Sequence, residues 1–413
     1  MKRKLVIIQQ GGGVDGLNLL IPTDQQDIYQ QLRPTVGIKE NSQLDLGSEY
    51  DLALHPSASS IKELFEMGVA RIVQQVAYPE GNQSHFESID ITMSGGDGTG
   101  RPTNGSIMGR FLEAKYPDYP TAFPNDKQKG PPGYAQGTAI PQNIWGSNSG
   151  EKGIRVISDP DYLYNVSQKV NQAKGVGSGM SKKERMIAIM NAADGQADKL
   201  GYELKRAYEA GLIVQVFNEG TISRQLKNVA KLIKGGLDTE VYMVSIGTFD
   251  THNDQVLAGD STKGVFTEQI EDVYGALLTF QRELMDAGLA DEVLTITSSE
   301  FGRRVTENDD LGTDHGTAYP MLIVGPGVAP GVSGANANLS NLDSNGDFAD
   351  FNYDYRQVFA TILKKWLGAG INQITAAGLL GFYNQMIDGL IDKPYPEDQL
   401  DQDYTGTDRK SVV

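Results

Sequence analysis

The chain has 413 residues, of which 39% are hydrophobic, 53 are acidic and 36 are basic, and it has no cysteine. The net charge of −17 disfavours nucleic acid and anionic membrane surfaces as partners, because phosphate contacts need a basic face. The lack of cysteine excludes disulfides, thiolate metal sites and cysteine nucleophiles, and no apolar run reaches the roughly 18 residues of a membrane-spanning helix.

A short apolar run over residues 4–9 predicts the first buried strand, and three consecutive glycines end it. Asp15 follows in the same glycine-rich turn. Its carboxylate is placed either to face a ligand or to cap its own turn. The next stretch, residues 20–50, has no regular hydrophobic period and is expected to form an irregular loop.

A helix is predicted over residues 57–67 and a second strand over residues 71–77. The loop after that strand leads into a further helix near Ser84. A serine at a helix start normally caps the helix. It can also act as a nucleophile, because the helix dipole favours a developing oxyanion. The residues alone leave both interpretations open.

Two long insertions are expected in the middle of the chain, near residues 95–150 and 165–215. The first contains a short predicted helix over residues 107–115, and the rest of it is rich in proline, glycine and asparagine. Long connections of this kind usually cover or extend a functional site. The second insertion is polar, and we interpret its run of lysine, glutamate and arginine as a solvated face.

The C-terminal half alternates between amphipathic helices and apolar strands. Uninterrupted apolar strands indicate a largely parallel sheet that helices cover on both faces. We therefore expect one α/β domain over residues 1–393, followed by an acidic tail over residues 394–413. The predicted strands are 241–246, 293–297 and 320–324, and the predicted helices are 222–233, 270–284 and 355–367.

Each of these three strands has an acid, a histidine or both at one end. In an α/β sheet such strand ends meet at one rim, and carboxylates and neutral imidazoles bind Zn²⁺ and similar divalent metals. The alternative is that the aspartates only orient their histidines by hydrogen bonds. The candidate ligands are Asp250 and His252 after the first strand, Glu300 after the second, and Asp314 and His315 before the third, with Asp254 as a further candidate.

Arg303 and Arg304 follow Glu300 in a glycine-containing turn. A guanidinium there could bind a phosphate or sulfate through two parallel hydrogen bonds. The alternative is an ordinary surface pair between arginine and glutamate.

Seven motifs occur in order along residues 5–367. They are Gly11-Gly-Gly-Val-Asp15-Gly-Leu-Asn, Leu54-His55-Pro56, Gln83-Ser84-His85-Phe86, Gly247-Thr-Phe-Asp250-Thr-His252, Ser299-Glu300-Phe-Gly-Arg303-Arg304, Gly312-Thr-Asp314-His315-Gly316 and Asp354-Tyr-Arg356. Together they resemble the bacterial domain-of-unknown-function family 1501, with Thr248 standing where that family usually has a second glycine. That family is similar to the alkaline phosphatase and sulfatase superfamily.

The resemblance implies an alkaline-phosphatase-like fold, which is a three-layer α/β/α sandwich with a mixed, mainly parallel central sheet. It also implies that Asp15 joins the other ligands in a metal centre at the strand ends. Ser84 and His85 fall where the superfamily has its nucleophile, and Arg303 would bind the ester oxygens. The expected cofactor is a divalent metal, with Zn²⁺ preferred over Ca²⁺ or Mn²⁺.

Two functions are compatible with this pattern. The first is a metal-dependent hydrolase of phosphate or sulfate esters, whose substrate is a small anionic ester or a sulfated or phosphorylated glycan. The second is a non-catalytic binding or cell-surface protein that retains the fold. Phe301 favours the second, because it stands where the superfamily's acid–histidine pair would have its histidine.

Family members are similar to proteins exported by the twin-arginine route. We therefore expect a periplasmic or extracellular location, with the leader absent from this chain. The sequence does not indicate the oligomeric state.

Overall fold

The computed structural model describes residues 2–99, 104–137, 144–147, 152–156, 160 and 197–396. Its centre is a nine-stranded sheet. The strands are β1 (Lys4–Gln10), β5 (Ala70–Ala77), β6 (Gly133–Gln136), β7 (Gly153–Val156), β8 (Val241–Ile246), β9 (Val293–Ser298), β12 (Tyr319–Val324), β13 (Gly331–Ser333) and β14 (Tyr353–Asp354).

The strand order is β13-β5-β12-β9-β1-β8-β6-β7, with β14 beside β5. Strand β12 pairs antiparallel with β5 and β9, and the other neighbours pair in parallel. Side chains alternate along each strand, so that Val6 and Ile8 of β1 pack on one face while Leu5 and Ile7 pack on the other. Both faces of the sheet are therefore buried.

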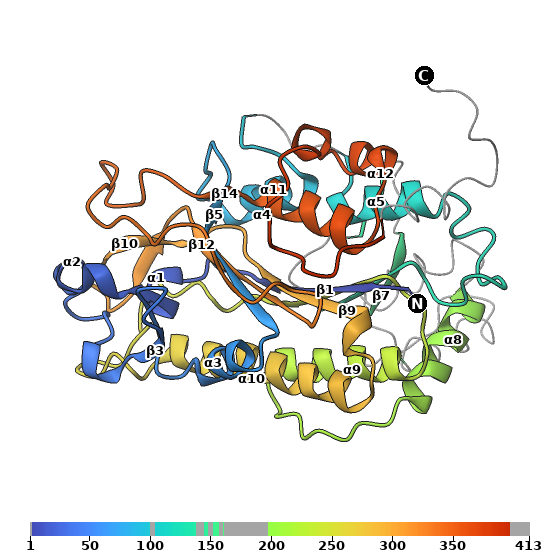
Figure 1. The fold of residues 1–413 in the computed structure, drawn as a ribbon, viewed down its shortest axis with the longest axis horizontal. Coiled ribbons are helices and arrows are strands. Elements are labelled where there is room, and N and C mark those ends of the chain that lie inside the picture. Colours follow the sequence, from blue (N-terminus) through green and yellow to red (C-terminus); the bar gives the residue numbers. More distant parts are fainter. Residues whose placement is uncertain are drawn as a thin grey trace, which may run out of the picture.

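Helices cover the two faces of the sheet (Figure 1). On one face lie α3 (Ser59–Glu66), α8 (Ala197–Ala210), α9 (Thr221–Lys234) and α10 (Val265–Asp286). On the other lie α4 (His85–Ser94), α5 (Ile107–Lys115), α11 (Tyr355–Thr361), its π-helical continuation η4 (Ile362–Trp366), and α12 (Ile371–Ala376). The predicted α/β/α sandwich with a mixed, mainly parallel sheet is confirmed, and the predicted strands and helices of the C-terminal half are found close to their expected bounds.

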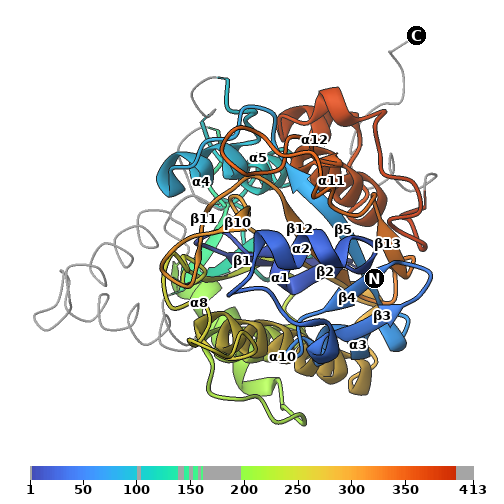
Figure 2. The same ribbon diagram turned by 90° about the vertical axis from the view of Figure 1, so that its left-hand side faces the viewer.

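The strand register sets where the connecting loops emerge. Gln10 of β1 pairs with Ile246 of β8, and Gln9 pairs with Ser298 of β9. These three parallel strands therefore end at the same edge of the sheet. Because β12 runs the opposite way, the segment before Tyr319 starts from that edge as well. Figure 2 looks onto it, with α1 (Gly16–Leu19), α4 and the hairpin of β10 (Arg303–Glu307) and β11 (Thr313–His315) in view.

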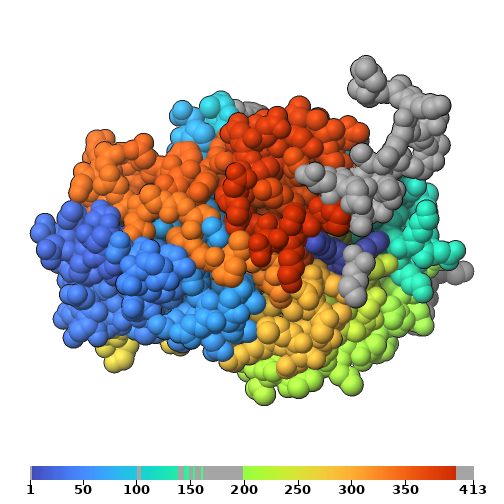
Figure 3. Space-filling view, viewed as in Figure 1, coloured from blue at the N-terminus to red at the C-terminus, as the bar shows by residue number. Residues whose placement is uncertain are grey.

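The expectation of an irregular loop over residues 20–50 is wrong. This stretch holds β2 (Leu20–Pro22), η1 (Thr23–Gln25), α2 (Gln26–Leu32), η2 (Glu40–Ser42) and β3 (Leu44–Gly47). Strands β2 and β3 flank β4 (Leu52–Leu54) in a small antiparallel sheet. The elements are too short for periodicity to reveal them. They are held by tertiary packing, because Tyr29 and Ile38 belong to a buried apolar cluster that includes Phe348. Residues 20–50, in blue, and the C-terminal segment in orange meet at one end of the molecule (Figure 3).

The expected insertion over residues 95–150 contributes α5 and the short strand β6, and a second short strand, β7, follows just after it. The sequence did not indicate β6 or β7, which extend the sheet beyond β8. Most of the insertion over residues 165–215 lies outside the described residues, as does most of the acidic tail. The remaining short helices are η3 (Ala290–Glu292) and η5 (Leu380–Phe382). Within the described part of the chain, no helix has the length and apolar character needed to cross a membrane.

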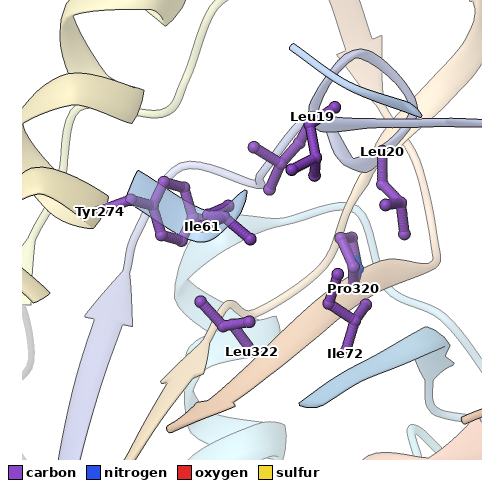
Figure 4. A pocket seen from close by; sticks show the side chains of 8 residues that line it. Leu19, Leu20, Ile61, Ile72, Tyr274, Pro320 and Leu322 are labelled. Atoms are coloured by element: carbon purple, nitrogen blue, oxygen red, sulfur yellow. The ribbon is translucent and has the colours of Figure 1, made fainter. Parts of the chain in front are cut away.

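A small apolar hollow lies between the sheet, α3 and α10 (Figure 4). It has room for about one water-sized molecule. Its lining carries no charged group, so we assign it to imperfect packing. The lining residues are Leu19, Leu20, Leu54, Ile61, Ile72, Tyr274, Pro320 and Leu322.

His55 is buried beside this core, with 1% of its surface exposed. Its Nδ1 accepts the amide hydrogen of Ser57 at 3.1 Å, and its ring meets the edge of Phe266. Burial lowers the pKa of His55 to about 4. The unfolded chain, with a pKa of about 6.5 at this residue, therefore binds a proton first as the pH falls.

We predict that His55 makes the protein less stable as the pH falls from 7 to 5, by about 2 kcal/mol. Its stabilising effect is present above pH 6.5 and is lost progressively toward pH 4. Urea unfolding at several pH values checks this. The His55→Asn variant, whose amide oxygen can accept the Ser57 hydrogen, should show a flatter pH dependence. Parallel curves for the two proteins would contradict the prediction.

Candidate metal centre

Three of the four histidines of the chain meet at the edge where β1, β8 and β9 end. His85 is the first residue of α4, His252 follows β8, and His315 ends β11 just before β12. The rings of His85 and His315 have centroids 4.3 Å apart, and those of His252 and His315 are 4.5 Å apart. Segments that are far apart in the sequence thus converge on one point.

His85 is held by a buried carboxylate. Its Nδ1 lies 2.8 Å from Oε1 of Glu300, and the same oxygen accepts the amide hydrogen of Gly12 at 2.7 Å. Because a carboxylate oxygen accepts and does not donate, Nδ1 of His85 carries the hydrogen. Among the residues that the structure describes, none makes a hydrogen bond of normal geometry with its buried Nε2. The lone pair of Nε2 is therefore directed at the cluster.

The other two histidines are held in the same way. Nδ1 of His315 lies 2.8 Å from the main-chain carbonyl oxygen of Gln83. Nδ1 of His252 lies 3.1 Å from Oδ1 of Asp314. Both partners are acceptors, so each Nδ1 donates and each Nε2 is left with its lone pair. Asp314 thus orients its histidine, which was the alternative that the sequence left open, and also receives a hydrogen bond from Asn308.

The three Nε2 atoms converge on the carboxylate of Asp250. Those of His252 and His315 each lie 3.1 Å from Oδ1, and that of His85 lies 3.4 Å from Oδ2. Nε2 of His252 and Nε2 of His315 are only 2.8 Å apart. Two lone pairs repel at this distance unless a proton or a cation lies between them. The ligand atoms of His85, Asp250 and His315 all fall within 4.8 Å of one another.

Arg303 is buried against this cluster, with 1% of its surface exposed. Its guanidinium donates a hydrogen bond of 2.6 Å to Oδ1 of Asp250. Nε, Nη1 and Nη2 all donate to the protein, which leaves little capacity for a ligand. The main-chain carbonyls that accept from Arg303 are those of Gly12, Gly13, Phe249 and Thr313.

The glycine-rich turn after β1 allows this close assembly. Gly12 has a φ of +114°, and a Cβ added there would lie 2.3 Å from the backbone nitrogen of Asp250. At Gly13, an added Cβ would lie 2.6 Å from the ring of Phe301. Any side chain at either position would push the turn away from the residues that it supports.

The local charges favour the ligating forms of two residues. Burial alone would raise the pKa of Asp250, but the hydrogen bond and the positive charge of Arg303 lower that pKa to about 2. Partial burial lowers the pKa of His315. The hydrogen bond to Glu300 raises the pKa of His85. At neutral pH Asp250 is thus a carboxylate and His315 a neutral imidazole, which are the forms that bind metals.

Asp15 lies in a different set of contacts. Its side chain is buried and pairs with Nη1 of Arg33 at 2.7 Å. It also accepts hydrogen bonds from the amide of Asn18 at 3.2 Å and from Nε2 of Gln255 at 2.6 Å. Asp15 therefore caps its own turn, and its carboxylate is occupied by these partners instead of the histidine cluster.

Ser84 precedes His85 at the start of α4. Its backbone occupies the N-cap position, but its side chain makes no capping hydrogen bond. Its amide donates to Oδ1 of Asn82 at 2.7 Å, and the residue is exposed. Asp254 is also exposed, in the loop that carries His252.

The roles of two contributors to the site could not be predicted from residue type. The Gln83 contact is made by a main-chain carbonyl, which carries no sequence signal. Phe301 is 2% exposed and packs against the rings of His85 and His315, with centroid separations of 4.9 and 4.8 Å. Phe301 therefore forms an apolar wall of the cluster.

Residues 232–378 match the family model described as Protein of unknown function (DUF1501). The resemblance drawn from the motifs is confirmed over this stretch. The DUF1501 match includes the segments that carry Asp250, Glu300 and His315, while the motifs around Asp15 and Ser84 lie outside it.

No curated protein matches the chain. Among solved structures, it is similar to Ps i-CgsB in complex with k-i-k-neocarrahexaose, with 11% identity, coverage of 94% of this chain and 75% of that chain, and a TM-score of 0.40. It is similar to the PsFucS1 sulfatase from Pseudoalteromonas sp., with 13% identity, coverage of 96% and 74%, and a TM-score of 0.38. It is also similar to a protein in the alkaline phosphatase superfamily from Vibrio parahaemolyticus, with 10% identity, coverage of 80% and 62%, and a TM-score of 0.32.

We predict that Asp15→Ala destabilises the protein by about 3–5 kcal/mol, because it leaves the buried guanidinium of Arg33 without its counter-charge. Urea unfolding measures this loss. Adding Arg33→Met to the variant should restore part of the stability. If Asp15 were instead a metal ligand, Asp15→Ala would lose bound metal with little change in the free energy of unfolding.

Proposed function

We propose that this protein is a metal-dependent hydrolase of phosphate or sulfate esters. The observation that carries the proposal is the convergence of three imidazole Nε2 atoms on Asp250, with every Nδ1 hydrogen-bonded on the far side of its ring. Such outer contacts fix the tautomer of metal-binding histidines and raise their basicity. In a histidine cluster that served only to stabilise the fold, three lone pairs directed at one point would repel one another and would not be expected.

The donor set fits a divalent cation. Ligand atoms around a tetrahedral ion with bonds of roughly 2.1 Å lie roughly 3.4 Å apart. Nε2 of His252 and of His315 lie 3.1 Å from Oδ1 of Asp250, and Nε2 of His85 lies 3.4 Å from Oδ2, which is close to this spacing. The two Nε2 atoms of His252 and His315 are closer to each other, at 2.8 Å. Nitrogen donors favour Zn²⁺ over Ca²⁺, which prefers a shell of oxygens. We propose that His85, Asp250 and His315 hold the metal and that His252 completes the set.

A divalent metal at this position would supply a Lewis acid that polarises the ester and lowers the pKa of a nearby hydroxyl. The residues of the chain hold the ligands for this task. Glu300 and Asp314 position His85 and His252, and Arg303 positions Asp250. This assigns supporting roles to Glu300, Asp314 and Arg303, which the sequence had suggested as ligands or as an ester-binding residue.

Ser84 is the proposed nucleophile. Its hydroxyl is exposed at the start of α4, one residue before His85, and makes no cap. The positive end of the helix dipole favours the negative charge of a phosphate or sulfate group at this position.

Arg304 is better placed than Arg303 to bind the ester oxygens. Its Nη1 lies 3.7 Å from Oδ2 of Asp314, beside His252, and its side chain is 28% exposed. Within the described residues its Nε has no hydrogen-bond partner, although that atom is buried. Among the described residues Arg304 thus makes fewer side-chain hydrogen bonds than Arg303, whose donors are taken up by the protein, and its side chain is more exposed.

The substrate proposed here is an anionic ester, either a small molecule or a sulfated or phosphorylated glycan. The net charge of −17 supports a substrate that is recognised at a local cationic site instead of along an extended polyanion. We also propose, from the family resemblance, that the protein acts in the periplasm or outside the cell. Fractionation of cells that express the full-length gene tests this location.

We predict that the purified protein binds Zn²⁺ or Mn²⁺ and that Asp250→Asn weakens this binding by at least about 100-fold, since it removes the central ligand charge. Isothermal titration of metal-stripped protein measures the affinity. Asp254→Asn is the matched control, because Asp254 lies exposed in the same loop and asparagine tolerates its φ of 51°. Equal affinities for the two variants would contradict the proposed ligand set.

Hydrolysis of aryl phosphates and aryl sulfates by the metal-loaded protein separates the two candidate functions. The hydrolase proposal expects activity that chelation abolishes and metal restores. Tight metal binding with no turnover of either ester class would instead favour the non-catalytic binding protein.

A further inference from the structure

Phe86 has 84% of its surface exposed, although it is the second residue of α4 and directly follows His85. Single exposed apolar residues are common and usually need no explanation. This one differs by its place, because the Cα atoms of adjacent residues are about 3.8 Å apart. Phe86 is therefore carried by the same segment that supplies His85 to the candidate metal centre.

The backbone that carries Phe86 is tightly held. The amide of Ser84 donates to Asn82, and the amide of Asn82 donates to the hydroxyl of Tyr78 at 3.0 Å. The carbonyl of Gln83 is bound to His315 at 2.8 Å. Farther along the helix, Ser88, Ile91 and Thr92 form its buried face. Phe86 is thus presented to solvent by a rigid segment that also forms part of the site, and an exposed side chain on such a support is pre-organised for binding.

The surroundings of the ring indicate what kind of group it contacts. Gln83, Ser84 and Glu87 are exposed polar neighbours. An acyl chain would need a contiguous apolar patch, which these residues interrupt. A sugar ring has an apolar C–H face and a rim of hydroxyls, so it can stack on one aromatic side chain and bind polar groups around it.

We propose that Phe86 is the stacking platform for the sugar ring that carries the ester, which makes the substrate a sulfated or phosphorylated saccharide. The inference rests on the hydrolase function proposed above. It adds a residue that selects the alcohol part of the substrate, whereas the metal centre acts on the anionic part.

Phe86→Ala tests the proposal by steady-state kinetics on a sulfated oligosaccharide and on methyl sulfate, which has no ring to stack. We expect the KM for the oligosaccharide, divided by the KM for methyl sulfate, to rise about tenfold, because the variant loses apolar contact with the sugar. Phe86→Tyr should restore the wild-type ratio. Tyr202→Ala is the control, since Tyr202 is an aromatic residue with 54% exposure on α8, a helix on the other face of the sheet from α4 (Figure 1).

Titration of the metal-loaded proteins with the same oligosaccharide gives a readout that does not need turnover. A tenfold weaker Kd for Phe86→Ala, reversed in Phe86→Tyr, supports the platform even if no ester is hydrolysed, in which case only the hydrolase proposal fails. Unchanged KM ratios and Kd values in Phe86→Ala, or no binding of the oligosaccharide by the wild-type protein, would overturn the platform whether or not methyl sulfate is turned over.

Discussion

The guanidinium of Arg303 ties together the loops that build the site. It donates to carbonyls in the turn after β1, in the loop after β8 and at β11, and it also binds the carboxylate of Asp250. A buried cation without such acceptors would cost several kcal/mol. The loops are therefore stable in this arrangement only when they meet around the guanidinium. The position of Asp250, and with it the convergence of the histidines, depends on this contact.

A second layer of contacts determines how the histidines face. Each imidazole donates its Nδ1 hydrogen to an acceptor outside the cluster, namely Glu300, the carbonyl of Gln83 or Asp314. These contacts bring Nε2 of His252 and Nε2 of His315 to within 2.8 Å of each other. Bringing two lone pairs together in this way is unfavourable unless a proton or a cation lies between them. The fold thus holds an arrangement that a proton or a bound cation relieves, and strain of this kind is common at functional sites.

Much of the fold could be predicted from the sequence, and the reasons are physical. The long apolar runs, such as β8, and the amphipathic stripe of α9 have strong periodicity, so their type and bounds follow from local pattern. The short elements between β2 and β3 have no such signal, because packing against Phe348 and its neighbours defines them. Strands β6 and β7 were missed because each has only four residues, in a stretch rich in glycine.

The position of the site could be predicted from the sequence better than the role of each residue in it. Parallel strands end at one edge, so acids and histidines at those ends must lie near one another. Which residue supports which other one depends on contacts across the chain. Glu300 and His85 are 215 positions apart in the sequence. Asp15 and Arg33 form an ion pair that no sequence motif predicts. The family match covers the C-terminal strand ends and leaves open the chemistry done there.

X-ray absorption spectroscopy of the Zn²⁺-loaded protein tests the central claim most directly, because it reports the atoms bound to the metal. The proposed ligand set predicts two or three imidazole nitrogens at about 2.0–2.1 Å together with carboxylate oxygen, and the loss of one imidazole in His315→Ala. A shell made only of oxygen, or a spectrum that His315→Ala leaves unchanged, would contradict it.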